Sequence, residues 1–205
     1  MNRYSGLMRR LLRVHPRSGQ MLNLLKCSAH FAAGHFPARL CYAPVSFGVH
    51  VTNRCNLDCP FCYNRAVHRA DLPDRDLSPA EFEQFLDHPD LRQAVRVAFT
   101  GGEPLPHPHL FEFVEQAHSR RMLTYVTTNG LLVEARLDEL GRSLLDTVQL
   151  SLYDEHVDRQ VENARRLRDA SPGRTGTPAA GAAATRRCRV SRASALPARW
   201  PTQCV

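Results

Sequence analysis

The chain has 205 residues and a formal net charge of +7, which allows one domain with appendages. The charge is uneven: residues 1–40 carry seven bases and no acid, residues 41–169 carry fourteen bases and twenty acids, and residues 170–205 carry six bases and no acid. No apolar run approaches the roughly 20 residues of a membrane-spanning helix, and no recognised nucleic-acid-binding motif accompanies the basic ends.

Residues 1–42 predict a basic, amphipathic helical extension. Pro16 separates two apolar runs with near-helical spacing, which are Leu7, Met8, Leu11 and Leu12, then Met21, Leu24 and Leu25. Such a segment could cover an open end of the domain that follows, or lie on an anionic membrane surface through residues 5–33. Arg and His interrupt any signal-peptide core, so we expect a cytoplasmic chain with peripheral membrane contact as the alternative.

Residues 43–170 alternate between strand and helix patterns. Apolar and β-branched residues predict strands, whereas longer periodic segments predict helices. The expected strands are 46–52, 95–100, 122–128 and 146–152, and the expected helices are 78–87, 108–120, 133–141 and 155–169. Ser78 suits the cap of the first of these helices and Pro79 its first turn. This order predicts an α/β domain with a parallel sheet.

Residues 171–205 break this pattern. They are rich in Ala, Arg and Pro and contain no acid, which predicts a disordered tail without strands. Cys188 and Cys204 are interpreted as stray thiols, because cluster sites need grouped ligands. The pattern ends where a fifth strand is due, so we expect a truncated or frame-shifted chain after about residue 169, with the fourth strand as an open edge.

Three cysteines form the most informative motif. Cys55, Cys59 and Cys62 have the spacing C-x₃-C-x₂-C, and thiolates select zinc, copper(I) or iron–sulfur clusters. A [4Fe–4S] cube normally takes four cysteines, so three would leave one iron open to bind and activate another molecule. A Cys₃His zinc site with His50 or His68 is the alternative. A disulfide framework fits poorly, since the seven cysteines are odd in number and no secretory signal precedes them.

Three further motifs follow the next three strands in order. They are G-G-E-P (Gly101 to Pro104), T-N-G (Thr128 to Gly130) and S-L-Y-D (Ser151 to Asp154). Each alone has a plain alternative, such as a turn before a helix or a helix cap. The P-L-P-H-P-H-L segment after the first of them predicts exposed loop histidines, His107 and His109.

Together these motifs resemble the radical S-adenosylmethionine (radical SAM) enzymes, whose cysteine loop reads C-x₃-C-x-aromatic-C, with Phe61 at the aromatic position. The resemblance covers about residues 44–170. It implies an incomplete (β/α) partial TIM barrel with about four of six units. It also implies a [4Fe–4S] cluster and S-adenosylmethionine as cofactors, and reductive cleavage to a 5′-deoxyadenosyl radical that abstracts hydrogen from an unknown substrate. The electron donor would be a protein such as flavodoxin or ferredoxin.

The resemblance also implies residue roles. Cys55, Cys59 and Cys62 would ligate the cluster, and the cofactor-binding residues would be Phe61, Tyr63, Gly101, Gly102, Glu103, Pro104, Thr128, Asn129, Ser151 and Asp154. Glu103 would accept charge-assisted hydrogen bonds from the methionine amine, and the paired glycines would let the backbone approach the cofactor. Phe61 and Tyr63 would lie against the adenine or pack over the cluster. Ser151 and Asp154 would contact ribose or the methionine carboxylate, or cap the next helix.

Two other functions stay open from the sequence. A non-catalytic fragment could bind the cluster without cleaving the cofactor, and a zinc-stabilised binding module could use the same cysteines. Anaerobic reconstitution would separate them by metal content.

Overall fold

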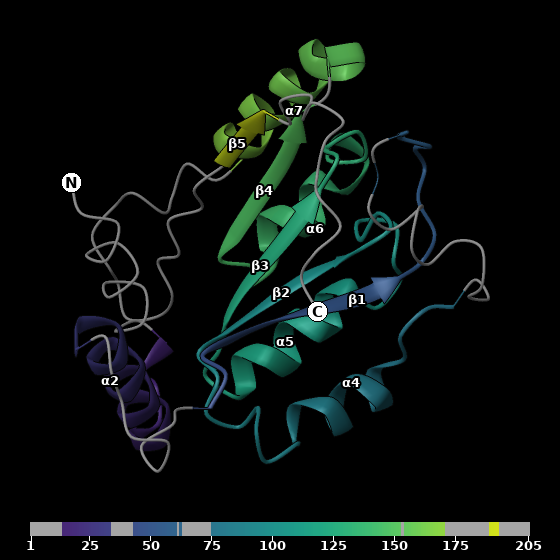
Figure 1. The fold of residues 1–205 in the computed structure, drawn as a ribbon. Helices are drawn as coiled ribbons and strands as arrows, with labels where there is room; N and C mark the ends of the chain where they lie inside the picture. The colour runs from purple at the N-terminus through teal and green to yellow at the C-terminus, as the bar shows by residue number, and fades with distance from the viewer. Residues whose placement is uncertain are drawn as a thin grey trace.

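A computed structural model of the chain describes residues 14–33, 43–60, 62, 75–152, 154–170 and 189–192. Its centre is a sheet of parallel strands in the order β1-β2-β3-β4-β5 (Figure 1). The strands are β1 (Ser46–Thr52), β2 (Arg96–Gly101), β3 (Leu123–Thr128), β4 (Thr147–Leu152) and β5 (Arg189–Arg192). The first four confirm the predicted strands within one residue at each end. Because neighbouring strands run in the same direction, their carboxyl ends share one edge of the sheet.

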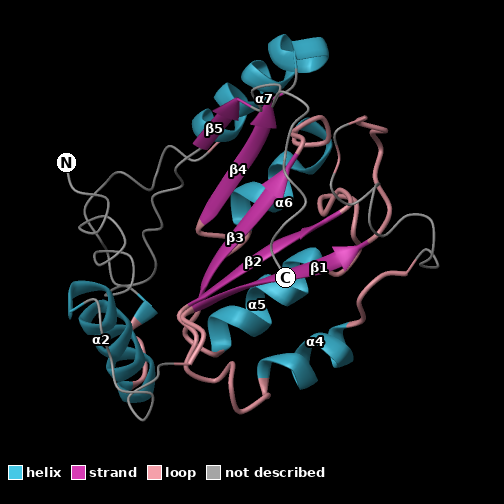
Figure 2. Cartoon of the chain, in the orientation of Figure 1, coloured by secondary structure: helices cyan, strands magenta, loops and turns pink. Residues whose placement is uncertain are grey.

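Helices connect the strands and lie along one side of the sheet (Figure 2). They are α4 (Pro79–Leu86), α5 (Leu110–Ser119), η2 (Glu134–Arg136), α6 (Leu137–Arg142), η3 (Asp154–His156) and α7 (Val157–Asp169). Helix α4 begins with the predicted cap: the Ser78 hydroxyl accepts from the Glu81 amide at 3.3 Å, and the Glu81 carboxylate accepts from the Ser78 amide at 2.9 Å. Within residues 133–141, a short 3₁₀ turn precedes the α-helix.

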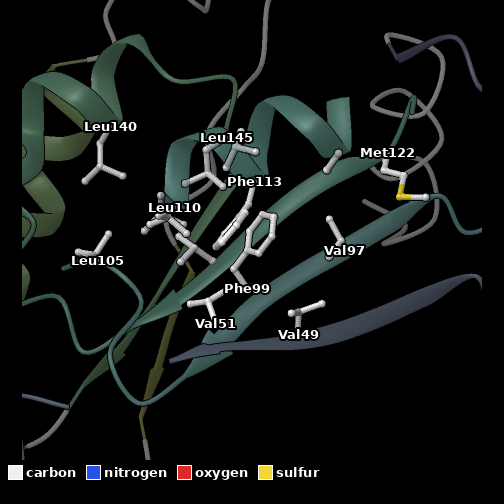
Figure 3. Packing of buried hydrophobic residues seen from close by; sticks show 14 of the residues in the cluster. Val49, Val51, Val97, Phe99, Leu105, Leu110, Phe113, Met122, Leu140 and Leu145 are labelled. Atoms are coloured by element: carbon white, nitrogen blue, oxygen red, sulfur yellow. The ribbon is translucent and has the colours of Figure 1, made fainter. Parts of the chain in front are cut away.

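The core lies between the sheet and these helices (Figure 3). Alternate strand residues point into it, and the buried rings of Phe99 and Phe113 stack with centroids 6.3 Å apart. The opposite face of the sheet carries half-buried polar residues such as Thr127 and Gln149. This pattern leaves the polar face of the α/β sheet on the side away from the helices.

Helix α2 (Ser18–Ala33) attaches to the amino ends of the strands through polar side chains. The buried Gln20 amide donates to the carbonyls of Ala94 (2.8 Å) and Arg120 (3.1 Å). The buried Asn23 amide donates to the Ala43 carbonyl at 3.0 Å and accepts from the Ala43 amide at 2.8 Å. These carbonyls precede β2, β3 and β1, so α2 covers the end of the sheet opposite the sequence motifs (Figure 1).

The apolar stripe predicted for this helix is therefore wrong in part. Leu24 packs against a small cluster with Val14 and Val95, but Leu25, which the predicted stripe included, is 61% exposed. Gln20 and Asn23 take the buried positions because the strand-leading carbonyls need hydrogen-bond donors. The first apolar run, in residues 1–13, lies outside the described residues. No helix in the described part of the chain is long and apolar enough to span a membrane.

Strand β5 corrects the prediction that no strand follows Asp169. Its residues pair in parallel with β4, with Leu150 opposite Val190 and Leu152 opposite Arg192. The edge of β4 offers backbone donors and acceptors to any extended segment, so the short sequence R-V-S-R can pair without an apolar run. Strand β4 is consequently not the open edge that we expected, and the rest of the predicted disordered tail lies outside the described residues.

Candidate functional site

The four sequence motifs lie at the edge formed by the carboxyl ends of the strands. The cysteine loop follows β1. The G-G-E-P segment begins at Gly101, the last residue of β2, and T-N-G begins at Thr128, the last residue of β3. Ser151 lies near the end of β4. In open α/β sheets this edge is where ligands bind. The shared edge brings together residues that are almost a hundred positions apart in the sequence.

The three thiols of the cysteine loop are half-buried. The loop is tightened by hydrogen bonds from the Cys62 amide to the Cys59 carbonyl (3.1 Å) and from the Leu57 amide to the Cys55 sulfur (3.4 Å). Burial raises the pKa of the Cys59 thiol, and the neighbouring Cys62 and Cys55 raise it further. Cysteine ligates a metal as the thiolate, so metal binding at this loop would displace the thiol protons.

The donor chemistry of this loop fits an iron–sulfur cluster. Among the described residues, no three His, Cys, Asp or Glu side chains converge closely enough to hold a single metal ion. A [4Fe–4S] cube does not require such convergence, because each thiolate binds a different iron of the cube. Three soft sulfur donors on one loop are the ligand type that iron–sulfur clusters take.

The G-G-E-P segment lies directly against the start of the cysteine loop. The Gly102 amide donates to the Thr52 carbonyl at 2.7 Å, and the Glu103 amide donates to the Arg54 carbonyl at 2.8 Å. A Cβ on Gly101 would overlap the Thr52 carbonyl oxygen, and one on Gly102 would overlap that of Arg54. Both glycines are therefore needed for contact between two backbone segments, and their approach to a cofactor stays a prediction.

Asp76 anchors the same loop from the other side. Its carboxylate accepts from the Thr52 hydroxyl at 2.6 Å and pairs with the Arg54 guanidinium. The Arg54 amide in turn donates to the Thr52 hydroxyl at 3.1 Å. Sequence reasoning missed Asp76, because the residue lies in no recognised motif, and an isolated β-bridge of the fold brings it to Thr52.

Glu103 is a buried carboxylate with three donors. Its Oε1 accepts from the Thr128 hydroxyl (2.6 Å) and the Leu105 amide (3.1 Å), and its Oε2 accepts from the Asn129 amide (2.8 Å). Burial raises the pKa of Glu103, and the three hydrogen bonds oppose that rise. A carboxylate oxygen has two lone pairs, so Oε2 keeps acceptor capacity for one more donor. The predicted contact with an amine is compatible with this geometry.

Asn129 joins the third motif to the cysteine loop. Its Nδ2 donates to Asn56 Oδ1 at 2.7 Å, and its Oδ1 accepts from the Leu131 amide at 3.0 Å. Two buried amides of α7 hold this turn: Gln160 donates to the Asn129 carbonyl at 2.7 Å, and Asn163 donates to the Gly130 carbonyl at 2.8 Å. Sequence reasoning missed three partners of this turn, which are Asn56, Gln160 and Asn163. For the two on α7, polar amides beside the apolar stripe of the helix were the available signal.

The remaining predicted cofactor-binding residues are Pro104, Ser151, Phe61, Tyr63 and Asp154. Pro104 is buried, and its carbonyl accepts from the His107 amide at 3.0 Å. Ser151 is half-buried, and its carbonyl accepts from Gln160 Nε2 at 3.0 Å. Phe61 and Tyr63 lie outside the described residues, as does the Asp154 side chain. The cap residue of α7 is His156, which makes no side-chain cap bond, and a capping or cofactor role for Asp154 stays a prediction.

The prediction of an exposed His107 is also wrong. The side chain is buried, its Nδ1 accepts from the His109 amide at 3.1 Å, and its ring packs 5.1 Å from the ring of Phe113. Burial lowers the pKa of His107, and the neighbouring His109 and Arg54 act in the same direction. His107 is therefore a neutral, packed residue behind the G-G-E-P turn, whereas His109 is exposed as expected.

Comparisons with known proteins identify the family to which this chain belongs. The family model of the radical SAM superfamily matches residues 49–175. The chain is 34% identical over 126 residues to a PqqA peptide cyclase of Granulibacter bethesdensis, covering 60% of this chain and 32% of that protein. It is 34% identical over 149 residues to a GTP 3′,8-cyclase of Mycobacterium marinum, covering 65% of this chain and 38% of that protein.

A solved structure agrees at the level of the fold. SuiB of Streptococcus suis, in a crystal structure bound to S-adenosylmethionine, matches with a TM-score of 0.52 at 19% identity, over 72% of this chain and 32% of SuiB. The chain thus spans about a third of the length of the relatives that it matches. Since the family model covers more than half of the chain, and its motifs meet at one edge of the sheet, the chain belongs to the radical SAM superfamily.

Proposed function

We propose that this chain holds a [4Fe–4S] cluster through Cys55, Cys59 and Cys62 and binds S-adenosylmethionine at the same edge of the sheet. The chemistry that these cofactors supply when bound is one-electron cleavage of a sulfonium carbon–sulfur bond, which leaves methionine and a hydrogen-abstracting 5′-deoxyadenosyl radical. The observation that carries the proposal is a three-thiol loop tied by backbone hydrogen bonds to G-G-E-P. Cys27, the other described cysteine, lies in α2 at the opposite end of the sheet.

The residues of the chain would act by binding and orientation. The three thiols would give up their protons to ligate iron, which would leave one iron of the cube for another ligand. Glu103 would accept from the ammonium group of the methionine moiety through the remaining capacity of Oε2. A cation beside Glu103 would lower its raised pKa and so favour the ionised form.

We propose no particular substrate for the hydrogen abstraction. The relatives named above include a peptide cyclase and a GTP cyclase, so one scaffold carries different substrates. A one-electron donor protein such as flavodoxin or ferredoxin would reduce the cluster. Contact of residues 5–33 with a membrane surface stays a prediction.

The test is formation of 5′-deoxyadenosine by the anaerobically reconstituted chain with dithionite and S-adenosylmethionine. Wild type should form 5′-deoxyadenosine only when reductant is present. Cys59→Ala should form none, whereas Cys27→Ala is the matched control and should behave as wild type. A chain that carries a full cluster but forms no 5′-deoxyadenosine would contradict the catalytic proposal and support a non-catalytic cluster-binding fragment.

A further inference from the structure

We infer that Asn129 is a positioning residue that holds the cysteine loop through Asn56, with helix α7 holding Asn129 in place. The sequence motif suggested direct cofactor contact for Asn129. Its side chain is 6% exposed and engaged at both ends, by donation to Asn56 Oδ1 at 2.7 Å and acceptance from the Leu131 amide at 3.0 Å. The geometry therefore points to a structural link between two motifs.

The turn that carries Asn129 is fixed from below by α7. Gln160 is fully buried and donates from one amide nitrogen to the carbonyls of Asn129 (2.7 Å) and Ser151 (3.0 Å). Asn163 donates to the Gly130 carbonyl at 2.8 Å, where Gly130 adopts a left-handed φ of 78°. Buried carbonyls at a turn need such partners, so the two amides fix the backbone position from which the Asn129 side chain reaches the loop.

The far end of this link lies between two proposed cluster ligands. Asn56 directly follows Cys55 and precedes Cys59 by three positions. Asn56 itself is exposed, so its bond to the buried Asn129 restrains a loop that otherwise faces solvent. A loop ordered before metal arrives loses less conformational freedom on binding it. The link would thus shape the loop in the apo chain and slow the loss of iron afterwards.

The same turn also holds Glu103, through the Thr128 hydroxyl at 2.6 Å and the Asn129 amide at 2.8 Å. The carboxylate proposed to receive the methionine amine and the loop proposed to hold the cluster are therefore positioned by one turn. The inference rests on the proposed function only for the role of the loop as a cluster-binding segment. The link itself exists in the chain without cofactors.

Hydrogen exchange of the 205-residue apo chain tests the link, measured at the backbone amides of residues 55–59. Asn56→Ala should speed exchange there about threefold to tenfold, as expected for loss of one partly buried hydrogen bond. Asn129→Ala should speed it at least as much, because it also removes the bond from the Leu131 amide. The double variant should exchange no faster than Asn129→Ala, because both single variants remove the Asn129–Asn56 bond. Asn56→Asp keeps the acceptor oxygen and should exchange as wild type, and Gln84→Ala, an exposed amide on α4, is the matched control.

Exchange in Asn56→Ala within twofold of wild type would overturn the inference, as would rates in the double variant that multiply those of the singles. Asn56 is exposed, so its alanine variant tests the link without a risk to the core. After reconstitution, both alanine variants should lose iron to a chelator several-fold faster than wild type, and equal rates would contradict the positioning role. If wild type takes up no iron, the proposed function fails while the exchange result still decides this inference.

Discussion

Replacement of Gly102 by alanine should destabilise the chain by about 2–4 kcal/mol, from overpacking and one lost hydrogen bond. The added Cβ would overlap the Arg54 carbonyl oxygen and lie 3.0 Å from the carbonyl carbon of Asn53. These are backbone atoms, so no flexible side chain can move aside. Relief would require separation of two segments that are joined by the Gly102 amide to the Thr52 carbonyl (2.7 Å) and the Glu103 amide to the Arg54 carbonyl (2.8 Å).

Gly48→Ala is the matched control in the neighbouring strand. A Cβ there would meet only the Ala98 carbonyl oxygen at 3.9 Å, an ordinary contact, so the change should stay within about 0.5 kcal/mol of wild type. Urea unfolding of the apo chain, followed by circular dichroism, measures both variants. A lower midpoint with an unchanged slope in Gly102→Ala would confirm the prediction. Equal stability of the two variants would refute the reasoning from backbone contact.

Three further predictions use the same urea assay. Asp146→Ala should cost about 1–3 kcal/mol, because the buried Thr124 amide donates to Asp146 at 2.8 Å and would lose its partner; a loss below 0.5 kcal/mol would count against this. Gln160→Leu should cost about 2 kcal/mol by leaving two carbonyls, one of them that of Ser151, without this donor, and an unchanged midpoint would contradict it. Burial lowers the pKa of His107, so below about pH 6.5 the unfolded chain binds a proton at this residue more readily than the folded chain does. The free energy of unfolding of wild type should therefore fall as pH falls below about 6.5. His107→Phe should lack that part of the slope, and identical pH profiles would show the reasoning to be wrong.

The arrangement of the sheet could be predicted because each strand carries its own apolar pattern. Val49, Val97, Val126 and Val148 each belong to the alternating apolar residues of one of four separate strands, and helical segments between these strands favour parallel order. Parallel order alone then places the segments after each strand at one edge. The strand order of the structure therefore accounts for the meeting of the cysteine loop, G-G-E-P and T-N-G at one edge.

Elements held by polar or backbone contacts could not be predicted in this way. Gln20 and Asn23 are buried in α2 because carbonyls ahead of the strands need donors, and no apolar period signals that role. Strand β5 pairs with the backbone edge of β4, and its sequence R-V-S-R carries no apolar run that would have signalled a strand. His107 is buried because its loop folds back onto Phe113, a contact that composition of the loop does not reveal.

Within the site, sequence motifs identified the residues but not the links among them. The pairing of Thr128 and Asn129 with Glu103 spans 25 and 26 positions, and that of Asn129 with Asn56 spans 73. Such distances along the chain depend on the strand order and register, so the links become visible only in the folded structure. Asp76 belongs to the same class, since it acts on the loop from a segment without a motif.

Metal analysis of the anaerobically reconstituted wild-type chain tests the central claim most directly. The account predicts a brown protein with about four irons and matching acid-labile sulfide per chain, as in a [4Fe–4S] cube. Cys59→Ala should lose that iron, and Cys27→Ala should keep it. A colourless protein that holds one zinc per chain would contradict the account and support a zinc-stabilised binding module.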